Sequence, residues 1–549
     1  MGEALRKQQP PSTLEGQTKR LPRDRFGGTR LRVGEPTGFF HLERLGNRRL
    51  LVTPEGNAYW LTSVYHALEA FLEPSVIPSK YGGDANLWAT HRNERLLSWG
   101  FNTLGEYTST RGLPVGTWGS TTGNSIQLPF ILIMGAAVDS MSNPISLGLP
   151  EAVKDILAGV PTSAYNSYRG PLVDVYDPKF AQAYAAEVSY WSQAITGGFA
   201  NCPWVVGITT DDADNLFGFK SGAGAPVNAY PHIGYLAATT QFNYSGSLGA
   251  WQDSKLYTKY AWITYLKGKY ANIQALNSAW STGGFYTSFD DMGGYGSGTG
   301  VIDEDGRHTA WMGTMVYPFT NTGANSGVQS DLDTFLYQFV KTYTQTATTA
   351  IRAVDHNHLI FGPASINNYG AMARPQVIQG LADGGIDVLQ VNYDPIFGPN
   401  AGSMGGNNAT YDLVGKPVFV WYSVTANADS DMSAQPPVYG APNFPTQGLR
   451  GSHYQNVDLP AFLNAQGSNG DYYVLGFDWW ELVDNPGEGM NWGILTRLDN
   501  AYDGNEAVIA TGVDPWGFPT GGEAANYGNF LGSVKAANAT ILNAIAVGR

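Results

Sequence analysis

Short apolar segments recur along this chain, and segments with helical periodicity separate most of them. Eight of the apolar segments are predicted to be core strands, namely 59–64, 101–109, 128–138, 203–210, 358–364, 386–394, 416–424 and 472–482. Helical patterns cover 93–100, 176–195, 257–280 and 331–355. Alternation of this kind indicates parallel strands with helical crossovers. We therefore predict an α/β fold, a (β/α)8 TIM barrel with a short N-terminal β-hairpin extension and long loop insertions at the barrel mouth.

A doubly wound sheet could show a similar order of elements. No Gly-x-Gly-x-x-Gly follows any predicted strand, however, so a nucleotide-binding sheet is less favoured. The stretch "TPEGN" is a turn built on Gly56 and predicts a hairpin before the first core strand. Gly- and Asn-rich insertions at about 215–250, 285–330 and 395–410 are expected to decorate the loops around the mouth.

These patterns divide the chain into four expected parts. They are a basic, disordered tail (1–30), an N-terminal β extension (31–58), the barrel (59–515) and a C-terminal helical segment packed on the barrel (516–549). The tail is Pro-rich and lacks the apolar core of a signal peptide.

Carboxylates and aromatic residues gather where the predicted strands end, which is where the chemistry of such barrels takes place. The stretch "PWVVGITTDDADN" passes from an apolar strand into three aspartates, Asp211, Asp212 and Asp214. The other candidates at strand ends are His66, Glu106, Asn392, Tyr393, Trp421, Tyr422, Asp478, Trp479, Trp480 and Glu481, with Glu488 in the loop that follows. Two carboxyl groups and flat rings suit glycoside chemistry, where carboxyls flank the scissile bond and rings hold the sugar.

From about residue 50 to 515 the chain resembles the clan A glycoside hydrolases, most closely the agarases of glycoside hydrolase family 50. Several segments carry this resemblance in the family's order: "VTPEGNAYWLTSV", "LLSWGFNTLGEY", "VYDPKFAQAY", "PWVVGITTDD", "YLKGKYANIQALNSAW", "DHNHLIFGPA", "IDVLQVNYD", "KPVFVWYS" and "GFDWWELVDNPGEGMNWGIL". The resemblance implies a barrel that cleaves a neutral, agarose-like galactan.

The family's two catalytic glutamates are not found at the matching positions. In that family the general acid/base follows an Asn after the fourth strand, and the nucleophile ends the seventh strand. An ungapped match places Asp212 at the Asn position and Ala213 at the acid/base, and it places Tyr422 or a neighbour at the nucleophile. The resemblance therefore implies the fold and the sugar-binding surface, whereas the double-displacement mechanism does not carry over.

Other side chains could supply the chemistry. Asp212 or Asp214 could act as the acid, kept protonated by the neighbouring like charges, with Glu481 as the base. Such a pair with room for a water molecule would give an inverting hydrolase. Tyr422 could instead be a nucleophile, or the base of a polysaccharide lyase. A third alternative is a non-catalytic carbohydrate-binding barrel.

Structural roles compete with each of these assignments. The three aspartates could form a solvated turn or part of a calcium site. Glu481 could belong to a structural ion pair, and Glu488 could serve only loop hydrogen bonding. Of Trp479 and Trp480, one ring is expected in the core and the other under a sugar, while His66 could either line the pocket or bond the backbone.

Charge and composition narrow the partners. The net charge is −14 and no basic patch stands out beyond the first residues, which argues against nucleic acid and favours a neutral substrate over a polyanion. No run of 18 apolar residues is present, so no membrane span is predicted.

The single cysteine, Cys202, is expected to be buried and inert, and the histidines lack zinc-site spacing, so no metal or other cofactor is expected. A polysaccharide or oligosaccharide is the expected partner, with no indication of oligomeric state. A secreted or periplasmic bacterial location is expected, with the cytoplasm as the alternative.

Overall fold

The structure is a computed structural model of the chain. It describes residues 23–108, 127–135, 174–195, 197–211, 257–289, 299–302, 308–310, 326–364, 374–393, 404–424, 444, 446–485, 491–504 and 529–547. Residues 1–22 of the predicted tail therefore lie outside the described residues, as do most of the predicted loop insertions.

An antiparallel sheet of three strands precedes the barrel, as the hairpin prediction expected. It contains β1 (His41–Leu45), β2 (Arg48–Val52) and β3 (Ala58–Tyr59), in that order. Gly56 turns the chain between β2 and β3 with φ 88°, and a Cβ there would lie 2.5 Å from the Gly34 carbonyl oxygen. Only glycine accepts both constraints without strain. The predicted strand 59–64 is divided, because Trp60 separates β3 from the first barrel strand.

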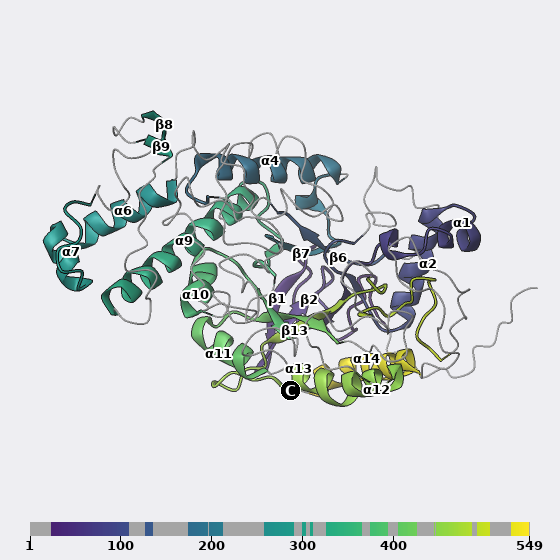
Figure 1. The fold of residues 1–549 in the computed structure, drawn as a ribbon. Coiled ribbons are helices and arrows are strands. Elements are labelled where there is room, and N and C mark those ends of the chain that lie inside the picture. Colours follow the sequence, from purple (N-terminus) through teal and green to yellow (C-terminus); the bar gives the residue numbers. More distant parts are fainter. Residues whose placement is uncertain are drawn as a thin grey trace, which may run out of the picture.

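Eight parallel strands form the central sheet, and they correspond to the eight predicted segments. They are β4 (Leu61–Val64), β5 (Thr103–Leu104), β6 (Phe130–Ile133), β7 (Val205–Thr209), β10 (Leu359–Ile360), β11 (Leu389–Tyr393), β12 (Val418–Ser423) and β13 (Val474–Trp480). The sheet order is β10-β7-β6-β5-β4-β13-β12-β11. A parallel bridge between Phe361 and Val388 joins its two ends beside β10 and β11. The predicted (β/α)8 architecture is thus confirmed (Figure 1).

Helices surround this sheet (Figure 1). Those that follow the early strands are α1 (Val76–Tyr81), α2 (Ala85–Ser98), α4 (Pro178–Ala194), α6 (Tyr257–Lys269) and α7 (Ile273–Ala279). The later ones are α9 (Ser326–Arg352), α10 (Pro375–Asp383), α11 (Met404–Val414), α12 (Gln447–His453), α13 (Leu459–Asn464) and α14 (Phe530–Val547). Short helical turns are η1 (Glu69–Phe71), η2 (Phe199–Asn201) and η5 (Tyr454–Asp458), and β8 (Thr299–Ile302) pairs with β9 (His308–Ala310). Among the described residues, no helix combines the length and apolar character needed to cross a membrane.

Local sequence explains where α4 begins. The Asp177 side chain accepts a hydrogen bond from the Lys179 backbone N–H at 2.9 Å, and Pro178 occupies the first helical position. The cap satisfies one of the free N–H groups of the first turn, and proline there has no N–H to satisfy.

Alternating strand residues contribute to two separate cores. One cluster fills the barrel interior, with Leu61, Tyr65, Phe419, Trp421 and Leu475 among its members. The other lies between the strands and the helices; its members on the last two strands are Val418, Val420, Tyr422, Val474, Phe477 and Trp479. Because successive strand residues point to opposite faces, this division decides which strand-end side chains face the interior.

The C-terminal helix α14 packs beside α12 (Figure 1), and it also contacts η5. Asn538 on α14 accepts a hydrogen bond from the Tyr454 hydroxyl at 2.6 Å and donates one to the Trp99 carbonyl oxygen at 3.1 Å. The helix therefore links the last barrel segments to the end of α2.

Candidate active site

Strand alternation separates the candidates of the last three strands into two groups. Asn392, Trp421, Asp478 and Trp480 share the face of the interior residues, whereas Tyr393, Tyr422 and Trp479 belong to the outer core. The sequence offered all seven as strand-end candidates and expected one of Trp479 and Trp480 to lie in the core. The structure places Trp479 in that core and brings only the first group together.

A polar layer crosses the interior, with one side chain supplied by each of four alternate strands. Gln390 on β11 donates to the Thr209 hydroxyl oxygen on β7 at 2.6 Å, and Thr209 donates to Glu106 Oε1, after β5, at 2.7 Å. Asp478 on β13 completes the layer. In such barrels, alternate strands commonly supply layers of four side chains that are usually branched and apolar. Here the equivalent layer is polar, and its four members are at most 1% exposed.

Small residues make room for the Asp478 carboxyl group. A Cβ on Gly105 would lie 2.3 Å from Asp478 Oδ2, so only glycine fits at that position. Ser63, which pairs with Asp478 in register on β4, directs its hydroxyl to the Phe477 carbonyl oxygen at 3.1 Å. The carboxyl of Asp478 can therefore approach the residue that follows Gly105, which is Glu106.

Burial raises the pKa of Asp478 well above its ordinary value, and the negative charge of nearby Glu106 raises it further. Two buried carboxyls that interact in this way cannot both be ionised readily. The pair therefore retains a proton at pH values where an exposed aspartate has lost its own.

Several buried polar atoms at this end of the barrel have no hydrogen-bond partner within the described parts of the chain. They are Gln390 Oε1, Asn392 Oδ1 and Trp421 Nε1. Buried polar groups are normally paired, so such a set indicates a place for water or ligand. Two of these three atoms are acceptor oxygens, so an occupant with hydrogen-bond donors fits best.

Aromatic rings lie next to this layer. Tyr65 stacks on Trp480 with centroids 4.3 Å apart and an angle of 14°, and Trp421 meets both rings edge-on at 5.0 and 5.3 Å. Trp480 is partly exposed, whereas Tyr65 and Trp421 are buried. The exposed part of Trp480 can offer a sugar a flat apolar surface.

His66 and Glu481 form a close pair beside these rings. Nδ1 of His66 lies 2.5 Å from Glu481 Oε2, and both residues are at least 95% buried. His66 and Tyr107 adopt φ values of 47° and 51°, which non-glycine residues seldom adopt. The surrounding structure thus holds both residues in place at the ends of β4 and β5, and His66 fixes the orientation of the Glu481 carboxyl group.

The remaining candidates from described strands occupy structural positions. The hydroxyls of Tyr422 and Tyr393 donate to Asp458 at 2.6 and 3.3 Å, behind the barrel wall. Burial, followed by the charge of Asp458, raises the pKa of Tyr422 well above its usual value. Trp479 is fully buried and donates to the Trp492 carbonyl oxygen at 3.2 Å.

Asp211 also lies in the outer core. Its Oδ2 accepts the hydroxyls of Tyr184 on α4 and Tyr343 on α9 at 2.5 and 2.6 Å, and the side chain is 0% exposed. Asp211 therefore joins β7 to two helices. Asp212, Asp214 and Glu488 lie outside the described residues.

Sequence reasoning missed Gln390, Thr209 and Tyr65 as members of this site. The available signal was their position on or directly after a predicted strand. Gln390 stands two residues before Asn392, Thr209 two residues after Gly207, and Tyr65 immediately after Val64. No metal centre accompanies them, since the described residues contain no group of three His, Cys, Asp or Glu side chains suited to a metal ion.

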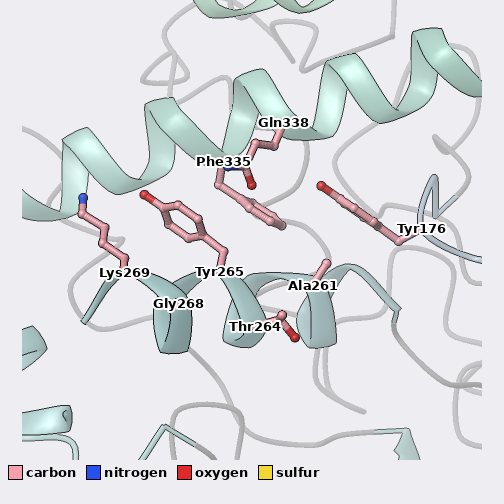
Figure 2. Close-up of a pocket in the computed structure, with 8 residues that line it drawn as sticks. All are labelled: Tyr176, Ala261, Thr264, Tyr265, Gly268, Lys269, Phe335 and Gln338. Atoms are coloured by element: carbon pink, nitrogen blue, oxygen red, sulfur yellow. The ribbon is translucent and has the colours of Figure 1, made fainter. Parts of the chain in front are cut away.

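A hollow of about 570 Å³ lies between α6 and α9, away from the strand ends (Figure 2). Tyr176, Tyr265 and Phe335 line it, together with Ala261, Thr264, Gly268, Lys269 and Gln338. Tyr265, on α6, donates to the buried Asp331 on α9 at 2.8 Å, which ties the two helices together. None of the strand-end candidates borders this hollow, so it is separate from the candidate site.

The structure is a (β/α)8 barrel with carboxyl groups and aromatic rings gathered at the carboxyl ends of its strands. No protein-family model matches the chain. It is 22% identical over 433 residues to beta-agarase A of Vibrio sp. (strain JT0107), which covers 76% of this chain and 35% of the relative. Beta-agarase B of the same strain is 21% identical over 439 residues, covering 77% and 36%. The match thus spans about a third of the length of each curated relative.

Solved structures agree with this fold. A structure of an exo-beta-agarase superposes with a TM-score of 0.63 at 17% identity, covering 97% of this chain and 69% of that one. A crystal structure of another agarase gives a TM-score of 0.57 at 18% identity, covering 87% and 65%. The predicted resemblance to the family 50 agarases and the predicted barrel are therefore confirmed.

Proposed function

We propose that this chain hydrolyses glycosidic bonds in a neutral polysaccharide or oligosaccharide of the agarose type. The observation that carries the proposal is the pair of buried acceptor oxygens, Gln390 Oε1 and Asn392 Oδ1, which have no partner within the described residues and lie on the same interior face as Trp480. Sugar hydroxyls are donors that would satisfy those oxygens, and the exposed part of the indole can stack on a sugar face. The similarity to beta-agarases A and B supports galactan as the substrate class.

The charge of the site favours a neutral polymer over an acidic one. Glu106, Asp478 and Glu481 are buried at the same end of the barrel, and a uronate or sulfate group brought among them would meet like charges in a low-dielectric setting. The non-standard carboxylates inferred from sequence therefore suit an uncharged substrate.

We assign the base to Glu481, whose carboxyl group is held by His66 Nδ1 at 2.5 Å. Asp212 or Asp214, close after β7 in the chain, is proposed as the acid. Carboxyls about 6.5–9.5 Å apart would leave room for a water molecule and invert the anomeric centre, whereas about 5–5.5 Å would give retention. We favour inversion, because no glutamate stands at either family position.

The lyase alternative requires Tyr422 to act as a base. A base must lose its proton near neutral pH, yet burial and Asp458 raise the pKa of this tyrosine, and its hydroxyl donates to Asp458. The geometry therefore favours hydrolysis over elimination.

Release of reducing ends from agarose and from a panel of neutral and acidic polysaccharides tests this function. We expect cleavage of the neutral galactan, and a loss of about 100- to 10,000-fold in rate for Glu481→Gln and Asp212→Asn. Asp383→Asn, on the exposed end of α10, is the matched control and should keep the full rate. The anomer first formed, followed by NMR, reports inversion or retention.

Absence of cleavage on every polymer by a folded wild-type chain would reject hydrolysis. If the chain then still bound the galactan, the non-catalytic carbohydrate-binding function would replace it. Products that absorb in the near ultraviolet would indicate elimination instead.

An intact polysaccharide does not cross a membrane, so we further propose that the protein acts outside the cytoplasm. Detection of the protein in the culture medium or periplasm of its source cells tests this. A protein confined to the cytoplasm would indicate short oligosaccharides as the substrate.

A further inference from the structure

The hollow between α6 and α9 has a row of aromatic rings along its floor. Phe335 on α9 lies between Tyr265 on α6 and Tyr176, which stands two residues before α4 (Figure 2). The ring centroid of Phe335 is 5.9 Å from that of Tyr176, at an angle of 9°, and 5.8 Å from that of Tyr265, at 37°. Phe335 is almost fully buried, whereas both tyrosines are partly exposed. The hollow therefore offers flat apolar surface at both ends of the row.

Contacts behind the row hold these rings in place. The Tyr265 hydroxyl donates to Asp331 at 2.8 Å, and Asp331 also accepts the Trp280 indole N–H at 2.7 Å. Trp262, which is 0% exposed, meets Phe335 edge-on at 5.0 Å and stacks on Tyr265 at 5.5 Å. Side chains that are already ordered lose little conformational freedom when a ligand binds. The row is thus a preformed surface.

One face of α6 leaves the rings uncovered. Four residues spaced three or four apart share this face and border the hollow: Ala261, Thr264, Tyr265 and Gly268. A helix face that packs closely carries large apolar side chains at this spacing, but only Tyr265 is large here. A Cβ on Gly268 would meet nothing within 4 Å, so packing does not require a glycine there, although glycine lowers the stability of a helix. The small residues of this face keep the hollow open.

The lining of the hollow has no uncompensated charge. Among the described lining residues Lys269 alone is charged, and its ammonium group pairs with Asp331, which is 0% exposed. At the rim, Thr264 is exposed and Gln338 is partly exposed, so a hydroxyl and an amide group can each donate and accept hydrogen bonds. Flat rings beside uncharged donors and acceptors suit a neutral ligand with many hydroxyl groups, whereas a polyanion would find no free cation in this lining.

The size of the hollow favours a short segment of a chain over a protein surface. Its volume of about 570 Å³ lies within the range of roughly 300–1,000 Å³ that is common for ligand sites. A stable protein interface needs a much broader contact area, of about 1,000 Å² or more. None of the large apolar side chains that are exposed in the described parts of the chain borders the hollow, so no apolar patch extends it.

We propose that this hollow is a second binding site for a segment of a neutral polysaccharide, separate from the site at the strand ends. Sugar faces stack on the rings of Tyr176 and Tyr265, and sugar hydroxyls bond Thr264 and Gln338. A second point of attachment keeps a long polymer near the protein, because rebinding at one site is fast while the other is occupied. The inference rests on the proposed function only for the class of polymer, since the hollow takes no part in bond cleavage.

Affinity electrophoresis of the full chain, in native polyacrylamide gels with and without agarose, tests this site. Gly268→Gln adds the side chain of a good helix former at the open border of the hollow, and it should weaken retention by agarose roughly 2- to 10-fold. Tyr176→Ala removes one ring of the row and should weaken retention by a similar factor. Both variants should release reducing ends from short, soluble agarose oligosaccharides at the wild-type rate, and from agarose more slowly.

One further variant and a stability measurement control for other effects. Lys267→Gln places the same new residue one position earlier on α6, outside the lining, and should match wild type in both assays. Thermal unfolding of each variant reports whether the fold is kept. If Tyr176→Ala does not fold, Gly268→Gln decides the question, because glycine has no side chain whose contacts could be lost.

Wild-type retention of folded Gly268→Gln or Tyr176→Ala would overturn the second site, and so would a wild-type chain that agarose does not retain. A wild-type dimer in sedimentation that Gly268→Gln converts into monomers would also overturn it, since the hollow would then join two copies of the chain. The proposed function fails separately. If Gly268→Gln lowers retention but wild type releases no reducing ends, the second site stands and hydrolysis falls, whereas cleavage with unchanged retention of the variants gives the reverse.

Discussion

Asp458 collects hydrogen bonds from three side chains behind the barrel wall. Tyr422 donates to it at 2.6 Å and Tyr393 at 3.3 Å, and His453 Nε2 lies 3.3 Å away. The two tyrosines end neighbouring strands β12 and β11, so this one carboxylate joins both strands to η5. A structural role for Tyr422 follows from these contacts.

Tyr422→Phe is therefore expected to destabilise the protein while leaving its hydrolytic rate near that of wild type. Removing the hydroxyl leaves Asp458 with one fewer donor in a buried place, at a cost of about 1–3 kcal/mol. Denaturant unfolding and a reducing-end assay measure the two effects. Tyr393→Phe is the matched control, with a smaller loss expected from its longer bond. A hundredfold slower Tyr422→Phe enzyme of unchanged stability would instead restore a catalytic role.

At the scale of elements, the eight strands and most helices could be predicted because each carries its own local pattern. The sequence did not show, however, which residues of a strand face the barrel interior. Both faces of a parallel strand are apolar, so Phe419 and Val420 are equally hydrophobic although they belong to different cores. The same limit explains why adjacent residues such as Trp421 and Tyr422 were assigned to one site.

Hydrogen-bond partners that are distant in the sequence could not be predicted either. Arg450 on α12 is an example. Its guanidinium donates to the carbonyl oxygens of Val424 at 2.9 Å, Gly493 at 2.8 Å and Trp492 at 2.5 Å. The first follows β12 and the other two follow β13, so one fully buried side chain fixes the loops after two adjacent strands. Nothing near Arg450 in the sequence indicates these contacts.

Arg450→Lys is expected to loosen both loops, because a lysine ammonium cannot match the planar, forked geometry of the guanidinium. The loss should be roughly 3 kcal/mol, with faster amide hydrogen exchange in segments 418–424 and 491–495. Exchange followed by mass spectrometry, together with thermal unfolding, measures it. Leu449→Ala changes the adjacent side chain, which is 51% exposed, and should leave both segments protected as in wild type. Equal exchange in Arg450→Lys and wild type would contradict the clamp.

For the whole molecule, buried carboxyl groups set opposing trends of stability with pH. Burial alone would raise the pKa of Asp355, but its contacts with His358, including Nδ1 at 2.8 Å, hold the pKa below the ordinary value. A lowered pKa contributes stability that is lost as the pH falls through it. Asp174 is the opposite case. It is 0% exposed, and burial raises its pKa to about 7 despite hydrogen bonds from Thr258 and Tyr176.

Asp174 should therefore make the protein less stable as the pH rises from acidic to neutral. Between its unfolded pKa near 3.8 and its folded pKa of about 7, the folded chain holds a proton that the unfolded chain has released. The free energy of unfolding falls across that interval by up to about 4 kcal/mol and is level above it.

Asp174→Asn cannot ionise, so its thermal midpoint should decline less over the same interval, although the amide gives up one bond to Thr258. Asp387→Asn, which removes a half-buried carboxylate paired with Arg352 at 2.9 Å, is the control and should keep the wild-type slope. Parallel midpoint curves for Asp174→Asn and wild type would mean that Asp174 is ionised in the folded protein throughout, with Thr258 and Tyr176 outweighing its burial.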